Sequence, residues 1–134
     1  MKTWNASILF LIIFSSYFVF GCSKTRDGNN CINYSDLPVT NVAGPNSGLV
    51  NQDIAVTLTF GISNGCGEFD HLEKNVMGNT TSINVAGKYT GCTCTLVYKE
   101  EQTVYNFKAT SAGTYYLKFF KENNSAIMDT IIVQ

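Results

Sequence analysis

The cysteines are the residues of this chain that could take part in the most kinds of chemistry. The 134-residue sequence holds five of them, at positions 22, 31, 66, 92 and 94. A cysteine thiolate can act as a nucleophile, bind a metal ion or exchange with a disulfide, and thiols in an oxidising compartment pair with each other. The compartment therefore decides which chemistry applies, and the first 22 residues predict the compartment.

The N-terminus has the pattern of an export signal. Lys2 is the only charge before an apolar run over residues 8–20, which a small residue and a cysteine close in the sequence Val19-Phe20-Gly21-Cys22. This ending resembles a bacterial lipobox, although the commonest lipobox has Leu and a small residue where this chain has Val19 and Phe20. The resemblance implies that residues 1–21 are a cleaved signal peptide and that Cys22 carries lipid. Plain secretion with cleavage after Gly21 and an uncleaved anchor are the alternatives.

The segment after Cys22 predicts a tether. Residues 23–30 contain no apolar side chain, so we expect a short flexible link between the lipid and a domain. In the lipoproteins that this chain resembles, Ser rather than Asp after the lipidated Cys goes with the outer membrane. The expected location is therefore the cell envelope, anchored to the outer membrane, with the domain facing either the periplasm or the outside.

Composition excludes several classes of partner. The chain has 9 basic and 10 acidic residues, so loss of Lys2 with the leader leaves a net charge of about −2, scattered along the sequence. Nucleic-acid binding needs clustered basic residues, and we expect none. No second apolar segment reaches the length of a membrane span. Residues 31–134 have the size of one domain.

The remaining sequence predicts strands. Ile54, Val56, Leu58, Phe60 and Ile62 alternate with smaller residues over residues 54–62, the period of a strand with one buried face. Shorter strands are expected at residues 39–42, 83–89, 92–98, 103–109, 115–119 and 127–133, while residues 69–77 are either a strand or an irregular crossing. Residues 44–48 and 99–101 read as turns, and the glycines at 87 and 91 indicate a bulge or a tight corner. The predicted fold is all-β, an antiparallel Ig-like β-sandwich of about seven strands.

A local motif supports the Ig-like prediction. The sequence Ser111-Ala112-Gly113-Thr114-Tyr115-Tyr116-Leu117 resembles the entry to the sixth strand of immunoglobulin domains. The resemblance implies that Tyr115 is the corner tyrosine, whose hydroxyl bonds to the chain upstream. Leu117 stands where antibody domains have Cys, so no antibody-type function is implied. Taken with the lipobox, the chain resembles small uncharacterised lipoproteins of bacterial envelopes.

If Cys22 carries lipid, the other four cysteines can form two disulfides. Cys92 and Cys94 on one strand would point the same way, with Cα atoms at about 6.5–7 Å, the edge of what a disulfide spans. Two pairings remain: Cys31–Cys92 with Cys66–Cys94, which we favour because it pins the N-terminal segment, or Cys31–Cys94 with Cys66–Cys92.

Metal and redox chemistry are the alternative use of these residues. Cys66, His71, Cys92 and Cys94 have the ligand types of a Cys₃His zinc site, and Cys92-Thr93-Cys94 has two closely spaced thiols. However, Cys-x-x-Cys spacing is absent, and we predict that His71 lies in an exposed loop. No serine or cysteine has an evident base and orienting partner, so we expect neither an enzyme nor a cofactor.

The sequence therefore predicts a lipid-anchored, non-catalytic binding or structural module of the cell envelope. Its expected partners are the membrane, through the lipid, and a protein or glycan ligand. Loops typically carry binding function, and residues 64–71 and 121–125 are the candidates. A metal-binding or thiol-redox envelope protein and a secreted carbohydrate-binding domain are the two alternatives.

Overall fold

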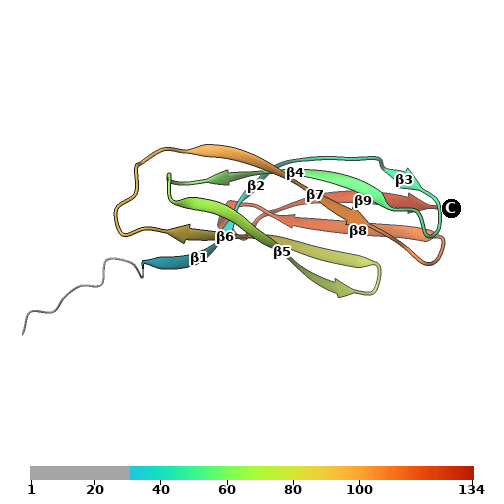
Figure 1. Ribbon diagram of the computed structural model, residues 1–134. Helices are drawn as coiled ribbons and strands as arrows, with labels where there is room; N and C mark the ends of the chain where they lie inside the picture. The colour runs from blue at the N-terminus through green and yellow to red at the C-terminus, as the bar shows by residue number, and fades with distance from the viewer. Residues whose placement is uncertain (1–30) are drawn as a thin grey trace, which may run out of the picture.

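The computed structural model describes residues 31–134, which form an elongated all-β sandwich (Figure 1). The predicted signal peptide, Cys22 and the tether lie outside the described residues. Within residues 31–134, no helix is long and apolar enough to cross a membrane. The strands are β1 (Ile32–Leu37), β2 (Val39–Ala43), β3 (Ser47–Gly48), β4 (Ile54–Ile62), β5 (Gly67–Met77), β6 (Thr80–Thr90), β7 (Lys99–Phe107), β8 (Gly113–Phe120) and β9 (Ala126–Val133).

Two sheets enclose the core. One is three-stranded, in the order β2-β4-β7, and the other is six-stranded, in the order β1-β6-β8-β9-β3 with β5 on the other side of β6. The alternation in β4 has the predicted effect, because its five apolar side chains are fully or almost fully buried. They pack against the inner face of the second sheet, which contributes Ile83, Val85, Leu117, Phe119, Ile131 and Val133. The all-β sandwich predicted from the sequence is confirmed.

Pro38 marks the point at which the chain changes sheets. Leu37 is the last residue of β1 and pairs with Val85 of β6, whereas Val39 begins β2 and pairs with Phe60 of β4. Proline has no N–H to donate to a strand ladder, so it suits the break between two pairings. Leu37 and Val39 are both buried, so the first part of the described chain is anchored in both sheets.

The expectation that all pairs are antiparallel is wrong in two places. The first half of β6 pairs in parallel with β8, and β3 pairs in parallel with β9. The β6–β8 pair follows from the connection, because β7 lies between these strands in sequence but crosses to the other sheet. Two strands separated by one strand of the opposite layer run in the same direction. In immunoglobulin domains the sixth strand, F, lies between strands C and G of an antiparallel sheet. The corresponding strand here, β8, lies between β6 and β9 and is parallel to β6, so the chain shares the layered architecture but not that strand order.

Several local predictions also need correction. Residues 92–98, predicted as a strand, lie in a loop over residues 91–98, and residues 99–101, predicted as a turn, begin β7. Sequence patterns missed β1, whose first five residues are exposed, and the two-residue β3 inside a cluster of turn formers. Residues 69–77 belong to β5. The predicted bulge near Gly87 lies on the facing strand, where Asp70 is an extra residue between Phe69 and His71.

Candidate functional site at the disulfide end

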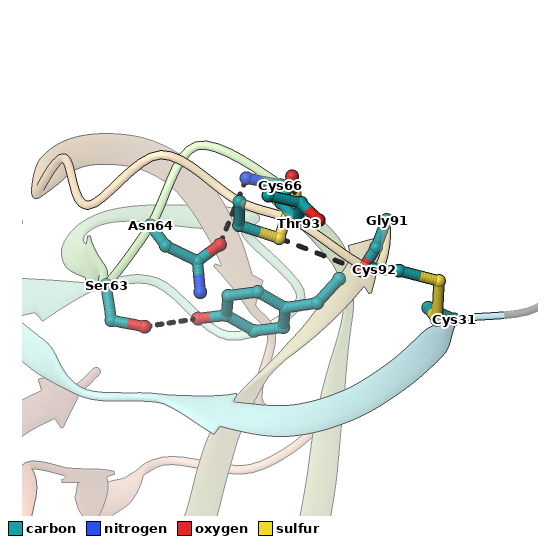
Figure 2. Close-up of a disulfide and its surroundings, with 9 residues drawn as sticks. Cys31, Ser63, Asn64, Cys66, Gly91, Cys92 and Thr93 are labelled. Carbon is teal, nitrogen blue, oxygen red and sulfur yellow. Dashed lines mark hydrogen bonds between the residues drawn. A yellow bond between two sulfur atoms is a disulfide. The ribbon is translucent and has the colours of Figure 1, made fainter. Parts of the chain in front are cut away.

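Two disulfides gather three segments at one end of the sandwich. Cys31 is bonded to Cys92, as Figure 2 shows, and Cys66 is bonded to Cys94, with Cα–Cα distances of 5.0 and 5.5 Å. This is the pairing that we favoured from the sequence. The premise about geometry was wrong, however, because Cys92 and Cys94 lie in a loop and not on a strand. We call this region the disulfide end and define it by Cys31, residues 63–67 and residues 91–98.

The β4–β5 loop is a compact turn built around Asn64. The Asn64 side-chain Oδ1 accepts a hydrogen bond from the Cys66 backbone N–H at 3.0 Å, and its carbonyl oxygen accepts one from Gly67 at 3.3 Å. This local bonding is typical of asparagine in turns. Gly65 donates across to the Thr95 carbonyl oxygen at 3.0 Å. The turn is thus tied to the neighbouring loop by this hydrogen bond and by the Cys66–Cys94 disulfide.

Gly91 allows the chain to turn out of β6 between the two disulfides. Its φ is +140°, a conformation that side-chain-bearing residues rarely adopt, and a Cβ here would lie 2.9 Å from Cys66 Sγ. The Gly91 N–H donates to the Cys31 carbonyl oxygen at 2.8 Å, and the Thr90 N–H donates to the Cys66 carbonyl oxygen at 3.1 Å. Both cysteine-bearing segments therefore dock on the end of β6 through backbone bonds as well as sulfur.

The rest of the β6–β7 loop presents apolar side chains to solvent. Val97 donates its N–H to the Thr95 carbonyl oxygen at 3.0 Å, which closes a three-residue turn with Leu96 at its apex. Leu96 is 98% exposed. Tyr98 then lies over Gly61, where a Cβ would come within 2.5 Å of the phenol oxygen. Loss of hydration and the carboxylate of Glu100, 3.3 Å from that oxygen, raise the pKa of Tyr98 above its ordinary 10.0. Sequence reasoning missed this surface, because the alternation of Cys92, Cys94, Leu96 and Tyr98 imitates a strand.

The alternative zinc interpretation does not fit these cysteines. A thiolate is required to bind zinc, but the sulfurs of Cys66, Cys92 and Cys94 are all in disulfides. Among residues 31–134, no group of three or more His, Cys, Asp or Glu side chains could hold a metal ion. The structure does not assemble the predicted Cys₃His set.

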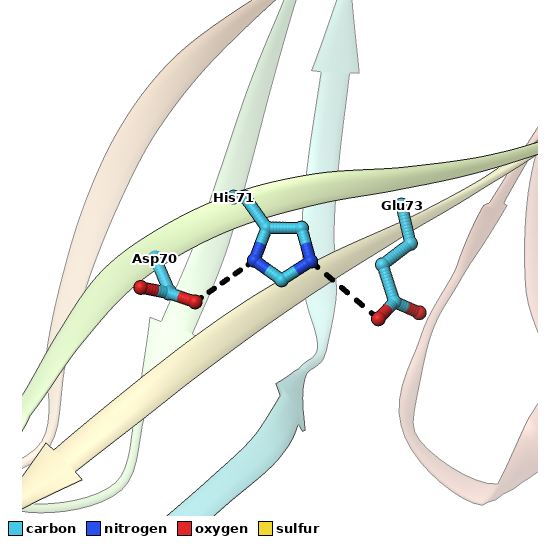
Figure 3. Close-up of polar contacts among 3 residues, drawn as sticks. All are labelled: Asp70, His71 and Glu73. Carbon is cyan, nitrogen blue, oxygen red and sulfur yellow. Dashed lines mark hydrogen bonds and ion pairs between the residues drawn. The ribbon is translucent and has the colours of Figure 1, made fainter.

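His71 lies on β5 and not in a loop, and carboxylates flank it. Its Nδ1 is 2.8 Å from Asp70 Oδ2, and its Nε2 is 3.5 Å from Glu73 Oε1 (Figure 3). Neighbouring strand residues normally face opposite ways, and the bulge at Asp70 relaxes that alternation. Glu73 is two residues further along and shares a face with His71. The hydrogen bond to Asp70 is the main cause that raises the pKa of His71 above 6.5.

Tyr115 occupies the corner position that its motif implies. Its hydroxyl donates to the Ser111 carbonyl oxygen at 2.9 Å, four residues upstream, and lies 3.1 Å from Ser111 Oγ. The ring packs against Phe107 at a centroid distance of 5.3 Å. Tyr115 therefore fastens the start of β8 to the preceding loop at the end opposite the disulfides, which is a structural role.

The two predicted binding loops differ. Residues 64–71 are a loop only up to Cys66, since β5 begins at Gly67. Residues 121–125 form the β8–β9 connection, in which Asn123 and Asn124 both have positive φ. This connection, with Asp36, Leu37, Pro38 and Asn84, lines a hollow of about 310 Å³. Two further hollows of about 260 and 290 Å³ are similar in size, so volume alone singles out no ligand site.

Comparison with known protein families identifies the same sandwich domain. Residues 56–133, more than half of the chain, match the family model described as the ORF11 beta-sandwich domain. The match begins within β4 and ends with β9, so it covers most of both sheets. The sequence matches no curated protein and no solved structure. The chain therefore belongs to the ORF11 beta-sandwich domain family.

Proposed function

We propose that this protein is a bacterial lipoprotein whose lipid-anchored sandwich acts, without catalysis, as a binding or structural module of the cell envelope. The observation that carries the proposal is the sequence Val19-Phe20-Gly21-Cys22 after an apolar run with one preceding charge. In this reading the leader is removed before Cys22, and the Cys22 thiol carries a diacylglycerol. Ser23 directs the product to the outer membrane.

Cysteine pairing supports this use of Cys22. The structure pairs the other four cysteines with one another, so Cys22 has no cysteine of its own chain left to pair with. An exported protein with an odd thiol would be exposed to oxidation and to intermolecular pairing. Acylation of the sulfur removes that liability. The two disulfides also fit an oxidising compartment outside the cytoplasm.

The surface of the sandwich supports the non-catalytic part of the proposal. Its one histidine, His71, is exposed, and within residues 31–134 its side chain contacts carboxylates of its own strand and no serine or cysteine nucleophile. The β8–β9 connection, beside the hollow of about 310 Å³, is one exposed loop surface that a protein or glycan partner would reach. Loops on a rigid scaffold are the usual place for such contacts.

Replacement of the proposed lipidation residue tests the anchor. The wild-type protein and a Cys22→Ala variant are expressed in a bacterium and partitioned between detergent and aqueous phases. We expect leader-free wild type in the detergent phase and no leader-free Cys22→Ala protein in that phase, because the variant has no thiol to acylate. A Ser23→Ala variant is the matched control and should still partition into detergent. Detergent partition of leader-free Cys22→Ala would refute the proposal.

A further inference from the structure

A rigidly held apolar tip projects from the disulfide end. Leu96 is 98% exposed, yet fixed positions flank it on both sides. Before it, Cys94 is bonded to Cys66 and the Thr95 carbonyl oxygen accepts hydrogen bonds from Gly65 and Val97. After it, Tyr98 lies against Gly61. Because both flanks are tied down, the loop presents Leu96 outward as a property of its fold.

The segments that form this tip carry no charged side chain, and the carboxylate of Glu100 lies at their edge, 3.3 Å from the Tyr98 hydroxyl. Residues 89–98 contain no Asp, Glu, Lys or Arg, and the same holds for residues 63–67 and 31–35. Val97 and Tyr98 in the loop and Ile32 beside Cys31 are also large, exposed apolar or aromatic side chains. A boundary between lipid headgroups and acyl chains accepts such a surface, with aromatic rings at headgroup level and aliphatic side chains below.

The start of the described chain, at Cys31, indicates what this surface faces. The described chain begins at Cys31, which is bonded to Cys92 of the same loop. Only residues 23–30 separate Cys31 from Cys22, and a fully extended chain over that distance spans at most about 32 Å. If Cys22 is in the bilayer, the disulfide end is therefore the part of the domain where the tether arrives.

We propose that Leu96 and Val97 insert into the surface of the lipid bilayer beside the anchor, an inference that rests on the proposed lipidation of Cys22. The acyl chains on Cys22 attach the protein to the membrane, and the inserted loop sets the orientation of the sandwich relative to it. It holds the long axis of the sandwich away from the membrane and directs the opposite end, with Leu49, Tyr115 and the C-terminus, into the aqueous space. Figure 1 shows these two ends far apart along the molecule.

A single tryptophan placed at the tip tests this orientation. Trp4 is the only tryptophan in the chain and leaves with the proposed leader, so the mature protein has no background signal. Leu96→Trp and the matched control Leu49→Trp, which replaces a leucine 63% exposed at the opposite end, are purified with their Cys22 lipid. Both are reconstituted into vesicles of phosphatidylethanolamine and phosphatidylglycerol containing brominated acyl chains.

We expect a blue-shifted emission and several-fold stronger quenching for Leu96→Trp than for Leu49→Trp. Flotation of the vesicles separates the two proposals. Protein that floats with vesicles but shows equal quenching at both positions overturns the insertion of the loop and leaves the anchor intact. Leader-free protein that fails to float overturns the lipidation of Cys22, and the insertion with it.

Discussion

The two ends of the sandwich hold their loops by different means. At the disulfide end, sulfur bonds fix an uncharged loop, residues 91–98, that pairs with no strand. At the opposite end, the Asn51 N–H bonds to the Ala109 carbonyl oxygen at 2.8 Å, and Lys108 Nζ lies 3.2 Å from Asp53 Oδ1. Covalent links thus add to the backbone hydrogen bonds where the loop leaves the strand ladder and exposes apolar side chains.

The largest expected effect concerns the covalent links. Replacement of the Cys31–Cys92 pair, Cys31→Ala/Cys92→Ala, should lower the free energy of unfolding by about 4 kcal/mol, because the bond closes a long loop in the unfolded chain. Lys108→Ala at the opposite end breaks an exposed ion pair and should cost at most about 1 kcal/mol. Guanidinium unfolding under non-reducing conditions measures both. Equal losses would mean that the two ends are held with equal strength.

Glycine substitutions compare the ends without touching sulfur. Gly91→Ala should cost about 2–3 kcal/mol, since its φ of +140° is unfavourable for alanine and the new Cβ meets Cys66 Sγ. Gly78→Ala in the β5–β6 turn should cost about 1 kcal/mol, because its φ is +61° and no atom lies within 4 Å of the new Cβ. Thermal unfolding ranks the two variants. A milder effect at Gly91 would contradict the crowding seen between the disulfides.

For tyrosine hydroxyls, we expect the larger loss of stability at the end opposite the disulfides. Tyr115→Phe at the opposite end should cost about 1 kcal/mol, because it leaves the Ser111 carbonyl oxygen without a donor at 2.9 Å. Tyr89→Phe at the disulfide end removes only a 3.4 Å contact with Ser63 Oγ and should cost less than about 0.5 kcal/mol. Urea unfolding of the two variants tests the ranking. Similar losses would deny Tyr115 its corner role.

The smallest effect is expected on β5, at His71. Its bond to Asp70 raises the folded-state pKa above the ordinary 6.5. Protonated His71 therefore stabilises the fold most fully below pH 6.5, and this contribution is lost as the pH rises through the folded-state pKa. An NMR titration should place the midpoint above 6.5, and Asp70→Asn should lower it. An unchanged midpoint in Asp70→Asn would show that the contact with Asp70 does not form in solution.

Sequence patterns predicted those parts of the fold in which burial alternates. The bounds of β4 follow from five apolar side chains at every second position, and the corner at Tyr115 from a short local motif. β1 escaped prediction because backbone pairing with β6 holds its largely exposed residues. The Cys92–Tyr98 alternation predicted a strand that does not form, since disulfides and a contact with Gly61 account for these side chains. The parallel β6–β8 pair depends on which layer β7 joins, and no local pattern encodes that.

Lipidation of Cys22 is tested most directly by the intact mass of the protein extracted from bacterial membranes without reduction. We expect a chain that begins at Cys22, carries a diacylglycerol and an acylated amino terminus, and lacks the four hydrogens lost in two disulfides. A chain with an unmodified amino terminus, or one that retains residues 1–21, would contradict it.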